Sequence, residues 1–373
     1  MSYGQGRPDS VGFPHADWGR KGIRAVGVAL AVAALVTAVV AMPAGATFPG
    51  PNGRISFWRF IPDKDGPDLG GLEIFSAGPD GSGEQRLTFS NDGRSSIFSD
   101  WSPDGSQIAF DSDRIDRDGL EDVVHVYTMP WNGETFGLQQ LTVGPGFHGD
   151  PAWSPSGQQI AIEADWADYP AQQGIWIIPA SDPDGVTQAE AQRVTAIPAG
   201  MDFDSEPQYS PNGQWIAFTR FKSCKFNERG RQAGFTHGCK SAIFRVRPNG
   251  TALRQLTPWG MEASAPDWSP NGTRIAFDVC DSGRVGCRGD IYVMNPDGSG
   301  KTRLTNNPTV QLDRFEFANN PVWSPNGSRI LFTQWKNEGF PQWLVSIAPD
   351  GSDPTVVVNG EFAQNKADWG THP

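Results

Sequence analysis

The stretch SDWSPDGSQIAF, residues 99–110, decides the fold because the chain repeats it. Its Ser-Pro-Asp-Gly core has the chemistry of a tight turn, since proline presets φ and glycine accepts a positive φ. The apolar run Ile-Ala-Phe that follows is typical of a short strand buried between two layers. Four further copies occur: PAWSPSGQQIAI (151–162), PQYSPNGQWIAF (207–218), PDWSPNGTRIAF (266–277) and PVWSPNGSRILF (321–332). Their leading aromatic residues, at 101, 153, 209, 268 and 323, lie 52 to 59 positions apart.

A second motif lies between these copies. IYVMNPDGSGKTRLT, residues 291–305, indicates a strand, a tight turn and a short final strand. Together the two motifs predict a unit of four antiparallel strands, here called a to d, with Trp on strand a, IAF on b, IYVM on c and RLT on d. Repeats of about 40–50 residues with four strands each are the signature of a β-propeller. We therefore predict an all-β fold, a six-bladed β-propeller of four-stranded antiparallel blades, with the strand-a aromatic residues packed between blades.

These residues also resemble a known repeat. WSPDGSQIAF and IYVMNPDGSGKTRLT are similar to the WD40-like repeat of the TolB type, found in the propeller of TolB and related exported proteins. The resemblance covers residues 47–373, in five full copies plus two fragments. It implies six blades and work with a protein partner. It implies much less about activity, because propellers host binding modules, scaffolds, lyases and peptidase caps alike.

The two ends of the repeat region complement each other. KADWGTHP, residues 366–373, holds a strand-a tryptophan, Trp369, without the turn and strand b that follow it elsewhere. FPGPNGRISF, residues 48–57, holds a turn and strand b without a tryptophan. We therefore expect residues 366–372 to supply strand a to a blade whose strands b, c and d come from residues 53–89. This closure would remove two open sheet edges.

The first 46 residues have the composition of an export segment. A basic stretch, GRKGIR (19–24), precedes an uncharged apolar run at 25–42, and small residues up to Ala46 suit a cleavage site. We expect a secretory signal that is cut after Ala46. An uncleaved membrane anchor stays open, because 18 apolar residues can just span a bilayer. Both alternatives place the propeller, residues 47–373, outside the cytoplasm as a secreted, periplasmic or cell-surface protein.

The charge of the chain limits its partners. The formal net charge is -12, and it becomes -14 without the first 46 residues, which hold four basic and two acidic side chains. Such a surface repels nucleic acid and anionic lipid, and it suits cationic partners or divalent metals. We expect a monomer that binds no nucleic acid and meets a membrane only through an uncleaved N-terminal segment.

All four cysteines lie beyond residue 220 and form two local pairs, Cys224 with Cys239 and Cys280 with Cys287. In an exported protein, an even number of cysteines in local pairs indicates two disulfides. Other pairings and a zinc site stay open, although the spacings match no standard zinc pattern.

The long b–c and d–a connections are expected to share one face, and function is expected there, because the a–b and c–d turns are mostly short. Acidic residues, one histidine and one arginine gather on that face. They could bind a cationic partner or a divalent ion, or they could be ordinary solvated loop residues. The candidate binding residues are His148, Asp150, Asp202, Asp204, Glu206, Glu262, Asp313 and Arg314.

Motifs for cofactors and catalysis are weak. DSDRIDRDGLED, residues 111–122, is rich in carboxylates and leaves calcium open, but it lacks the spacing of an EF-hand loop. We therefore expect no cofactor. The sequence contains neither G-x-S-x-G nor H-E-x-x-H, and its five histidines form no metal-spaced cluster. We predict a non-catalytic propeller that binds a protein or an envelope glycan on its long-loop face. The alternative is a hydrolase or lyase acting on carbohydrate in the central channel.

Overall fold

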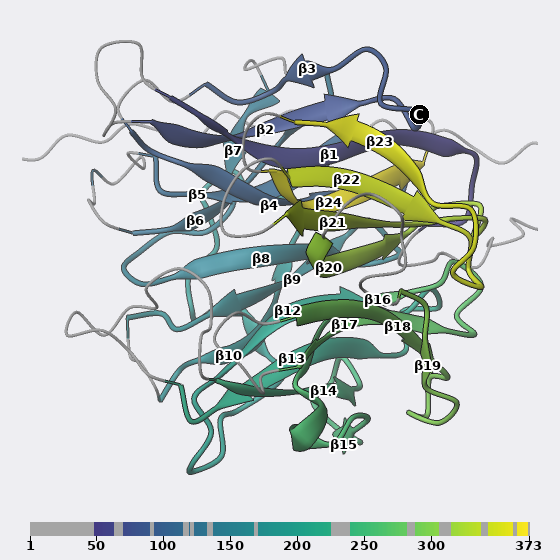
Figure 1. Ribbon diagram of the computed structural model, residues 1–373. Helices are drawn as coiled ribbons and strands as arrows, with labels where there is room; N and C mark the ends of the chain where they lie inside the picture. Colours follow the sequence, from purple (N-terminus) through teal and green to yellow (C-terminus); the bar gives the residue numbers. More distant parts are fainter. Residues whose placement is uncertain are drawn as a thin grey trace, which may run out of the picture. The chain divides into compact units, whose positions relative to one another are not determined.

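Six four-stranded antiparallel sheets form a propeller ring, and the structure has one short 3-10 helix among its described residues (Figure 1). The predicted all-β, six-bladed fold is confirmed. The protein is seen in a computed structural model that describes residues 48–62, 70–89, 93–114, 119, 123–132, 137–167, 171–224, 239–281, 288–305, 315–336, 342–360 and 364–371. The expected export segment lies outside these residues. No helix within them is long and apolar enough to cross a membrane.

Each blade contains strands a to d in spatial order. Blade 1 has β24 (Gln364–Thr371), β1 (Asn52–Ile61), β2 (Gly71–Ala77) and β3 (Gln85–Arg86). Blade 2 has β4 (Ser96–Trp101), β5 (Gln107–Ser112), β6 (His125–Pro130) and β7 (Gln139–Gln140). Blade 3 has β8 (His148–Trp153), β9 (Gln159–Ala164), β10 (Gly174–Pro179) and β11 (Gln192–Arg193). Blade 4 has β12 (Phe203–Tyr209), β13 (Ile216–Lys222), β14 (Lys240–Val246) and β15 (Arg254–Gln255). Blade 5 has β16 (Ala263–Trp268), β17 (Ile275–Asp281), β18 (Arg288–Met294) and β19 (Thr302–Arg303), with helix η2 (Trp259–Met261) before it. Blade 6 has β20 (Phe315–Trp323), β21 (Ile330–Lys336), β22 (Gln342–Ile347) and β23 (Thr355–Asn359).

The Ser-Pro-Asx-Gly turn is held by its own polar side chains. In blade 2 the Ser102 hydroxyl donates to the Asp104 carboxylate at 2.7 Å, and the Gly105 N–H donates to the Ser102 carbonyl at 2.9 Å. Gly105 has φ 70°, a left-handed conformation that glycine adopts without strain. The turn therefore fixes the register between strands a and b locally, which explains why the sequence repeats it so closely.

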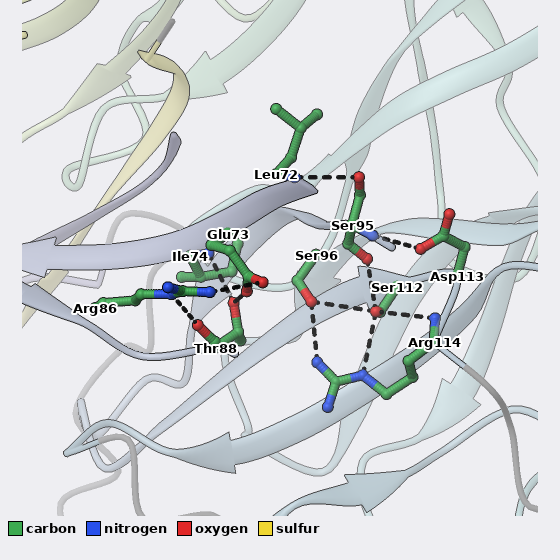
Figure 2. A network of polar contacts seen from close by, with 10 residues as sticks. All are labelled: Leu72, Glu73, Ile74, Arg86, Thr88, Ser95, Ser96, Ser112, Asp113 and Arg114. Atoms are coloured by element: carbon green, nitrogen blue, oxygen red, sulfur yellow. Dashed lines mark hydrogen bonds and ion pairs between the residues drawn. The ribbon is translucent and has the colours of Figure 1, made fainter. Parts of the chain in front are cut away.

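The Arg-Leu-Thr motif ties the short outer strand to strand c, as Figure 2 shows for blade 1. The Ile74 N–H donates to the Thr88 hydroxyl at 2.9 Å, and the Arg86 guanidinium donates to the Thr88 carbonyl at 2.7 Å. The Thr88 hydroxyl and Arg86 both contact the buried carboxylate of Glu73. A two-residue strand makes few ladder hydrogen bonds, so these side chains supply the missing ones.

The strand-a aromatic residues lie in the core between blades. Trp101 of blade 2 is 1% exposed and clusters with Trp58, Ile74 and Leu87 of blade 1. Its equivalents are equally buried: Trp153, Tyr209, Trp268, Trp323 and Trp369. The predicted packing of these residues between blades is confirmed. Burying a large aromatic side chain stabilises a fold by roughly 1.5–3 kcal/mol, so each blade interface has a strong apolar anchor.

Blade 1 joins the two ends of the described chain. In Figure 1 the yellow strand β24 lies beside the purple strand β1, and the two pair antiparallel with Trp369 opposite Ile55. Gly370 replaces the serine of the other repeats, and a Cβ atom there would lie 2.6 Å from the Trp101 ring. The strand order β24-β1-β2-β3 is the one expected from the incomplete motifs at the two ends of the repeat region.

A disulfide joins Cys224 to Cys239, one of the two expected pairs. The other pair stays a prediction, because Cys287 lies outside the described residues.

Candidate functional site

The inner strands of all six blades line one small hollow of about 40 Å³ at the centre of the ring. The wall comes from the three residues that precede each strand-a aromatic residue. Two positions before the aromatic residue, the wall is apolar in most blades, with Pro151, Pro207, Pro266, Pro321 and Ala367. The hollow is therefore the candidate site, since it is where the six blades converge and where polar side chains meet.

One ring of residues in this wall has an unusual backbone. Three positions before each aromatic residue, φ lies between 40° and 55°, in the left-handed region that non-glycine residues seldom adopt. The β-ladder between strands a and b has a register shift in the same part of each blade, as a β-bulge produces. Bulges re-aim side chains, and here they present one side chain per blade to the hollow. The members of this channel ring are Phe98, Asp150, Glu206, Ala265, Asn320 and Lys366.

An ion pair joins two members of the channel ring. The Lys366 ammonium contacts the Asp150 carboxylate, and the Ser205 hydroxyl donates to the other oxygen of Asp150 at 2.7 Å. Burial lowers the pKa of Lys366, but the charges of Asp150 and Glu206 more than offset this effect, so the pKa lies above its usual value. Lys366 is therefore a cation in the hollow at neutral pH.

Glu206 is held by its own blade and by the neighbouring one. Its carboxylate accepts hydrogen bonds from the Ala265 N–H and from the Thr219 hydroxyl, both at 2.8 Å. Burial raises the pKa of Glu206 to about 6, although the charge of Lys366 opposes the shift. This carboxyl group consequently titrates close to neutral pH.

Two further carboxylates lie behind the ring on strand b. Asp111 is fully buried on β5, and burial, followed by the charge of Asp150, raises its pKa well above the usual range. Glu163 on β9 accepts a hydrogen bond from the Gln173 amide at 3.1 Å, and burial likewise raises its pKa. Lys366 lowers the pKa of both groups, so its ammonium is the counter-charge of the whole cluster.

Three aspartates in the hollow have structural partners. The carboxylates of Asp368, Asp100 and Asp267 accept the N–H groups of Trp101, Trp153 and Trp323 respectively, at 2.7–2.8 Å. Each bond joins strand a of one blade to strand a of the next. These carboxylates therefore align the inner strands of neighbouring blades.

Of the candidates predicted from sequence, only Asp150 and Glu206 meet in the hollow. His148 is fully buried, with its Nδ1 atom 3.2 Å from Nδ1 of His125 and its ring against Trp166. Burial, and next the charge of His125, lower the pKa of His148 to about 3. His148 is thus a neutral packing residue between blades 2 and 3.

The remaining candidates lie elsewhere. Asp204 forms a buried bidentate ion pair with Arg220. The Arg220 Nε and Nη2 atoms donate to the two carboxylate oxygens of Asp204 at 2.5 and 2.6 Å. Asp202 accepts the N–H of Cys224 at 2.7 Å and so supports the start of the disulfide loop. Glu262 ends helix η2 with φ 49°. Asp313 and Arg314 lie outside the described residues.

The segment before β1 contacts several blades on the a–b turn side of the ring. Phe48 packs into the core of blades 2 and 3, and Pro49 lies beside Trp215 and Pro270 from blades 4 and 5. The Gly50 N–H donates to the Pro325 carbonyl in blade 6 at 3.3 Å.

Sequence reasoning missed Lys366 and Glu163, and it considered Asp111 only as part of the carboxylate-rich stretch 111–122. Lys366 sits three residues before Trp369, so extending the repeat alignment upstream of the aromatic residue would have placed it in the same column as Asp150 and Glu206. In the described part of the chain, no group of three or more His, Cys, Asp or Glu residues is arranged to hold a metal ion. Most of the stretch 111–122, for which calcium was left open, lies outside that part.

Comparisons with known proteins agree with this architecture. No protein-family model matches the chain. TolB from Acinetobacter baumannii superposes with a TM-score of 0.62, covering 86% of this chain and 67% of that chain at 20% identity. The Protein TolB homolog of Chlorobium luteolum is 26% identical over 213 residues, which are 57% of this chain and 37% of that protein. The chain is a TolB-like six-bladed β-propeller.

A second curated relative has a different description. The uncharacterized peptidase YuxL of Bacillus subtilis is 29% identical to the TolB-like propeller over 152 residues, 40% of this chain and 19% of that protein. The chain thus spans well under half the length of both curated relatives. The match covers only part of those longer proteins, so their activities do not transfer with it.

Proposed function

We propose that this TolB-like propeller is an exported, non-catalytic protein that binds a protein or cell-envelope partner at the long-loop side of its channel. The observation that carries the proposal is the acidic cluster around Asp150 and Glu206 in the hollow. A cluster with more carboxylates than cations attracts cationic groups, and the low dielectric of a partly enclosed site strengthens that attraction.

The wall of the hollow supports binding better than catalysis. Prolines at four of six equivalent positions make it rigid, and these four positions supply no group that transfers protons. The aspartates beside them already accept main-chain N–H groups. A rigid wall lowers the entropy cost of binding, as a preformed recognition site requires.

Export is supported by two independent features of the chain. The first 46 residues have the composition of a signal segment. The disulfide between Cys224 and Cys239 is of the kind that forms and persists in oxidising compartments outside the cytoplasm.

One observation favours the alternative of a carbohydrate hydrolase or lyase. Glu206 has a pKa of about 6 beside the carboxylate of Asp150, and a carboxyl group that titrates near neutral pH can act as a general acid. Both oxygens of Asp150 already have partners, however, so the second carboxylate of such a pair is occupied.

Retention of envelope components on the immobilised propeller tests the proposal. Glu206→Gln should lose a component that the wild type retains, whereas Asp297→Asn, on an exposed c–d turn, should keep it. Equal retention by both variants would overturn the proposal. A screen for turnover of polysaccharides tests the alternative of a carbohydrate hydrolase or lyase. If the wild type turns over a polysaccharide and the folded Glu206→Gln variant does not, the site is catalytic.

A further inference from the structure

The channel ring contains one cation, and the chain supplies it from its last strand. Two ring positions carry a carboxylate, Asp150 and Glu206, and one carries an ammonium, Lys366. Lys366 lies on β24, 216 residues after Asp150. The cation therefore reaches the cluster only when β24 is paired in blade 1.

The surroundings of Lys366 suit a primary ammonium group. Its Nζ atom contacts the Asp150 carboxylate and lies 4.3 Å from the centre of the Phe98 ring, within the range of a cation–π interaction. The side chain keeps 20% of its surface exposed and is part of the wall of the hollow. Carboxylate on one side and an aromatic face on another are the contacts that hold amines in proteins.

The cluster has more acceptor capacity than Lys366 uses. Asp111 is fully buried, and neither of its carboxylate oxygens has a hydrogen-bond partner among the described residues. This carboxylate abuts the chain next to Asp150, because a Cβ atom on Gly149 would lie 2.6 Å from its Oδ2 atom. Four carboxylates, those of Asp111, Asp150, Glu163 and Glu206, interact with one ammonium.

We infer that the channel holds a binding site for one primary ammonium group, which Lys366 fills in the free protein and which an amine of a partner takes by displacing it. Lys366 is then an autoinhibitory contact. An entering lysine side chain or free amine must compete with a tethered group of high effective concentration, which lowers its apparent affinity. Removing the Lys366 ammonium should expose the site.

Rescue with an added amine tests this inference. Lys366→Ala suits the backbone, because Ala265 occupies the equivalent position of blade 5 with φ 49°. We expect n-butylammonium chloride to raise the melting temperature of this variant up to a plateau. The concentration that gives half of the full shift should be at least about tenfold lower for the variant than for the wild type. Lys366→Met, whose apolar chain fills the space, should not respond.

Two further arms identify what the site recognises. Tetramethylammonium has the charge but no N–H donor, so it should not rescue Lys366→Ala. Nα-acetyl-lysine methylamide should bind more tightly than n-butylammonium if the ligand is a lysine of a polypeptide, and less tightly if it is a free amine. Equal responses of the wild type and all variants, or equal rescue by tetramethylammonium, would refute the ammonium site.

A labelling experiment on the intact chain keeps the inference testable if Lys366→Ala does not fold. Acetylation, followed by peptide mass spectrometry, should modify Lys366 at least about tenfold more slowly than the exposed Lys240, because a buried, ion-paired amine is a poor nucleophile. Asp150→Asn should accelerate the modification of Lys366. Equal rates for Lys366 and Lys240 in the wild type would contradict the account.

The ammonium site itself does not depend on the proposed function. Only the assignment of the bound amine to a binding partner rests on that function. If n-butylammonium fails to rescue Lys366→Ala, the ammonium site is refuted. Partner binding would still be supported if the wild type retains an envelope component that Glu206→Gln does not retain.

Discussion

The main-chain N–H of Trp101 on β4 donates to the carboxylate of Asp368 on β24 at 2.8 Å, so a residue of the last strand caps the inner strand of blade 2. The two residues are 267 positions apart in the sequence. The bond spans the boundary between blades 1 and 2, and the same contact recurs from Asp100 to Trp153 and from Asp267 to Trp323.

Asp368→Ala should lower the free energy of unfolding by roughly 1–3 kcal/mol, because it leaves the buried Trp101 N–H without an acceptor. Asp368→Asn keeps an acceptor oxygen and should lose less. Urea titrations at pH 7 measure both. Gln208→Ala, at the equivalent position of blade 4, is the matched control, and an equal loss in that variant would show that the hydrogen bond contributes nothing specific.

Deletion of residues 366–373 should destabilise the propeller more than any single substitution in β24. The deletion removes the inner strand of blade 1, exposes the edge of β1 and loses the burial of Trp369. Trp369→Ala in the full chain should cost roughly 3–5 kcal/mol, and the deletion more than that. Thermal melts followed by circular dichroism compare the three proteins. A truncated protein that melts with the intact one would contradict the closure through β24.

Acid should destabilise the protein through His148. Its pKa falls from 6.5 to about 3 on folding, so the unfolded chain binds more protons between these values and stability drops as pH falls from 6.5 toward 3. One proton corresponds to about 1.4 kcal/mol per pH unit.

His148→Gln removes this titration and keeps hydrogen-bonding capacity. Its free energy of unfolding, measured in urea from pH 7 to pH 4, should therefore fall less steeply than that of the wild type. The carboxyl groups of Glu206 and Asp368 act in the opposite direction, because their pKa values rise to about 6 and the stability they contribute is lost as pH rises. Comparing the two proteins cancels those contributions, and identical slopes would show that His148 does not titrate as described.

Non-reducing peptide mapping should link Cys224 to Cys239, and Cys280 to Cys287. The first bridge has a sequence separation of 15 residues, so replacing both of its cysteines by serine should cost about 3 kcal/mol. Cross-linked pairs between the two loops, or free thiols in protein recovered from the envelope, would refute the pairing.

The fold was predictable because its information is local. A turn such as Ser102–Gly105 closes within four residues, and its repetition at regular intervals identifies the blade before any long-range contact is known. The incomplete motifs around Trp369 and Phe48 predict how the ring closes. The first has strand a without the turn and strand b, and the second has the turn and strand b without the tryptophan.

The site was only partly predictable because its contacts cross between blades. Asp150 and Glu206 were found as acidic loop residues, but nothing near them in the sequence indicates Lys366, which comes from the far end of the chain. His148 was misplaced among surface candidates for the same reason, since His125 and Trp166 bury it from two blades. Burial of this kind depends on which strands of neighbouring blades contact each other in the ring.

Site-specific photocrosslinking tests the central claim, that the long-loop side of the channel is the binding face. A benzoylphenylalanine at Phe98, in the channel ring, should give a discrete adduct with an envelope component in cells, whereas the same group at Trp131, after strand c on the turn side, should not. Adducts of equal yield from both positions, or none from Phe98, would contradict the account.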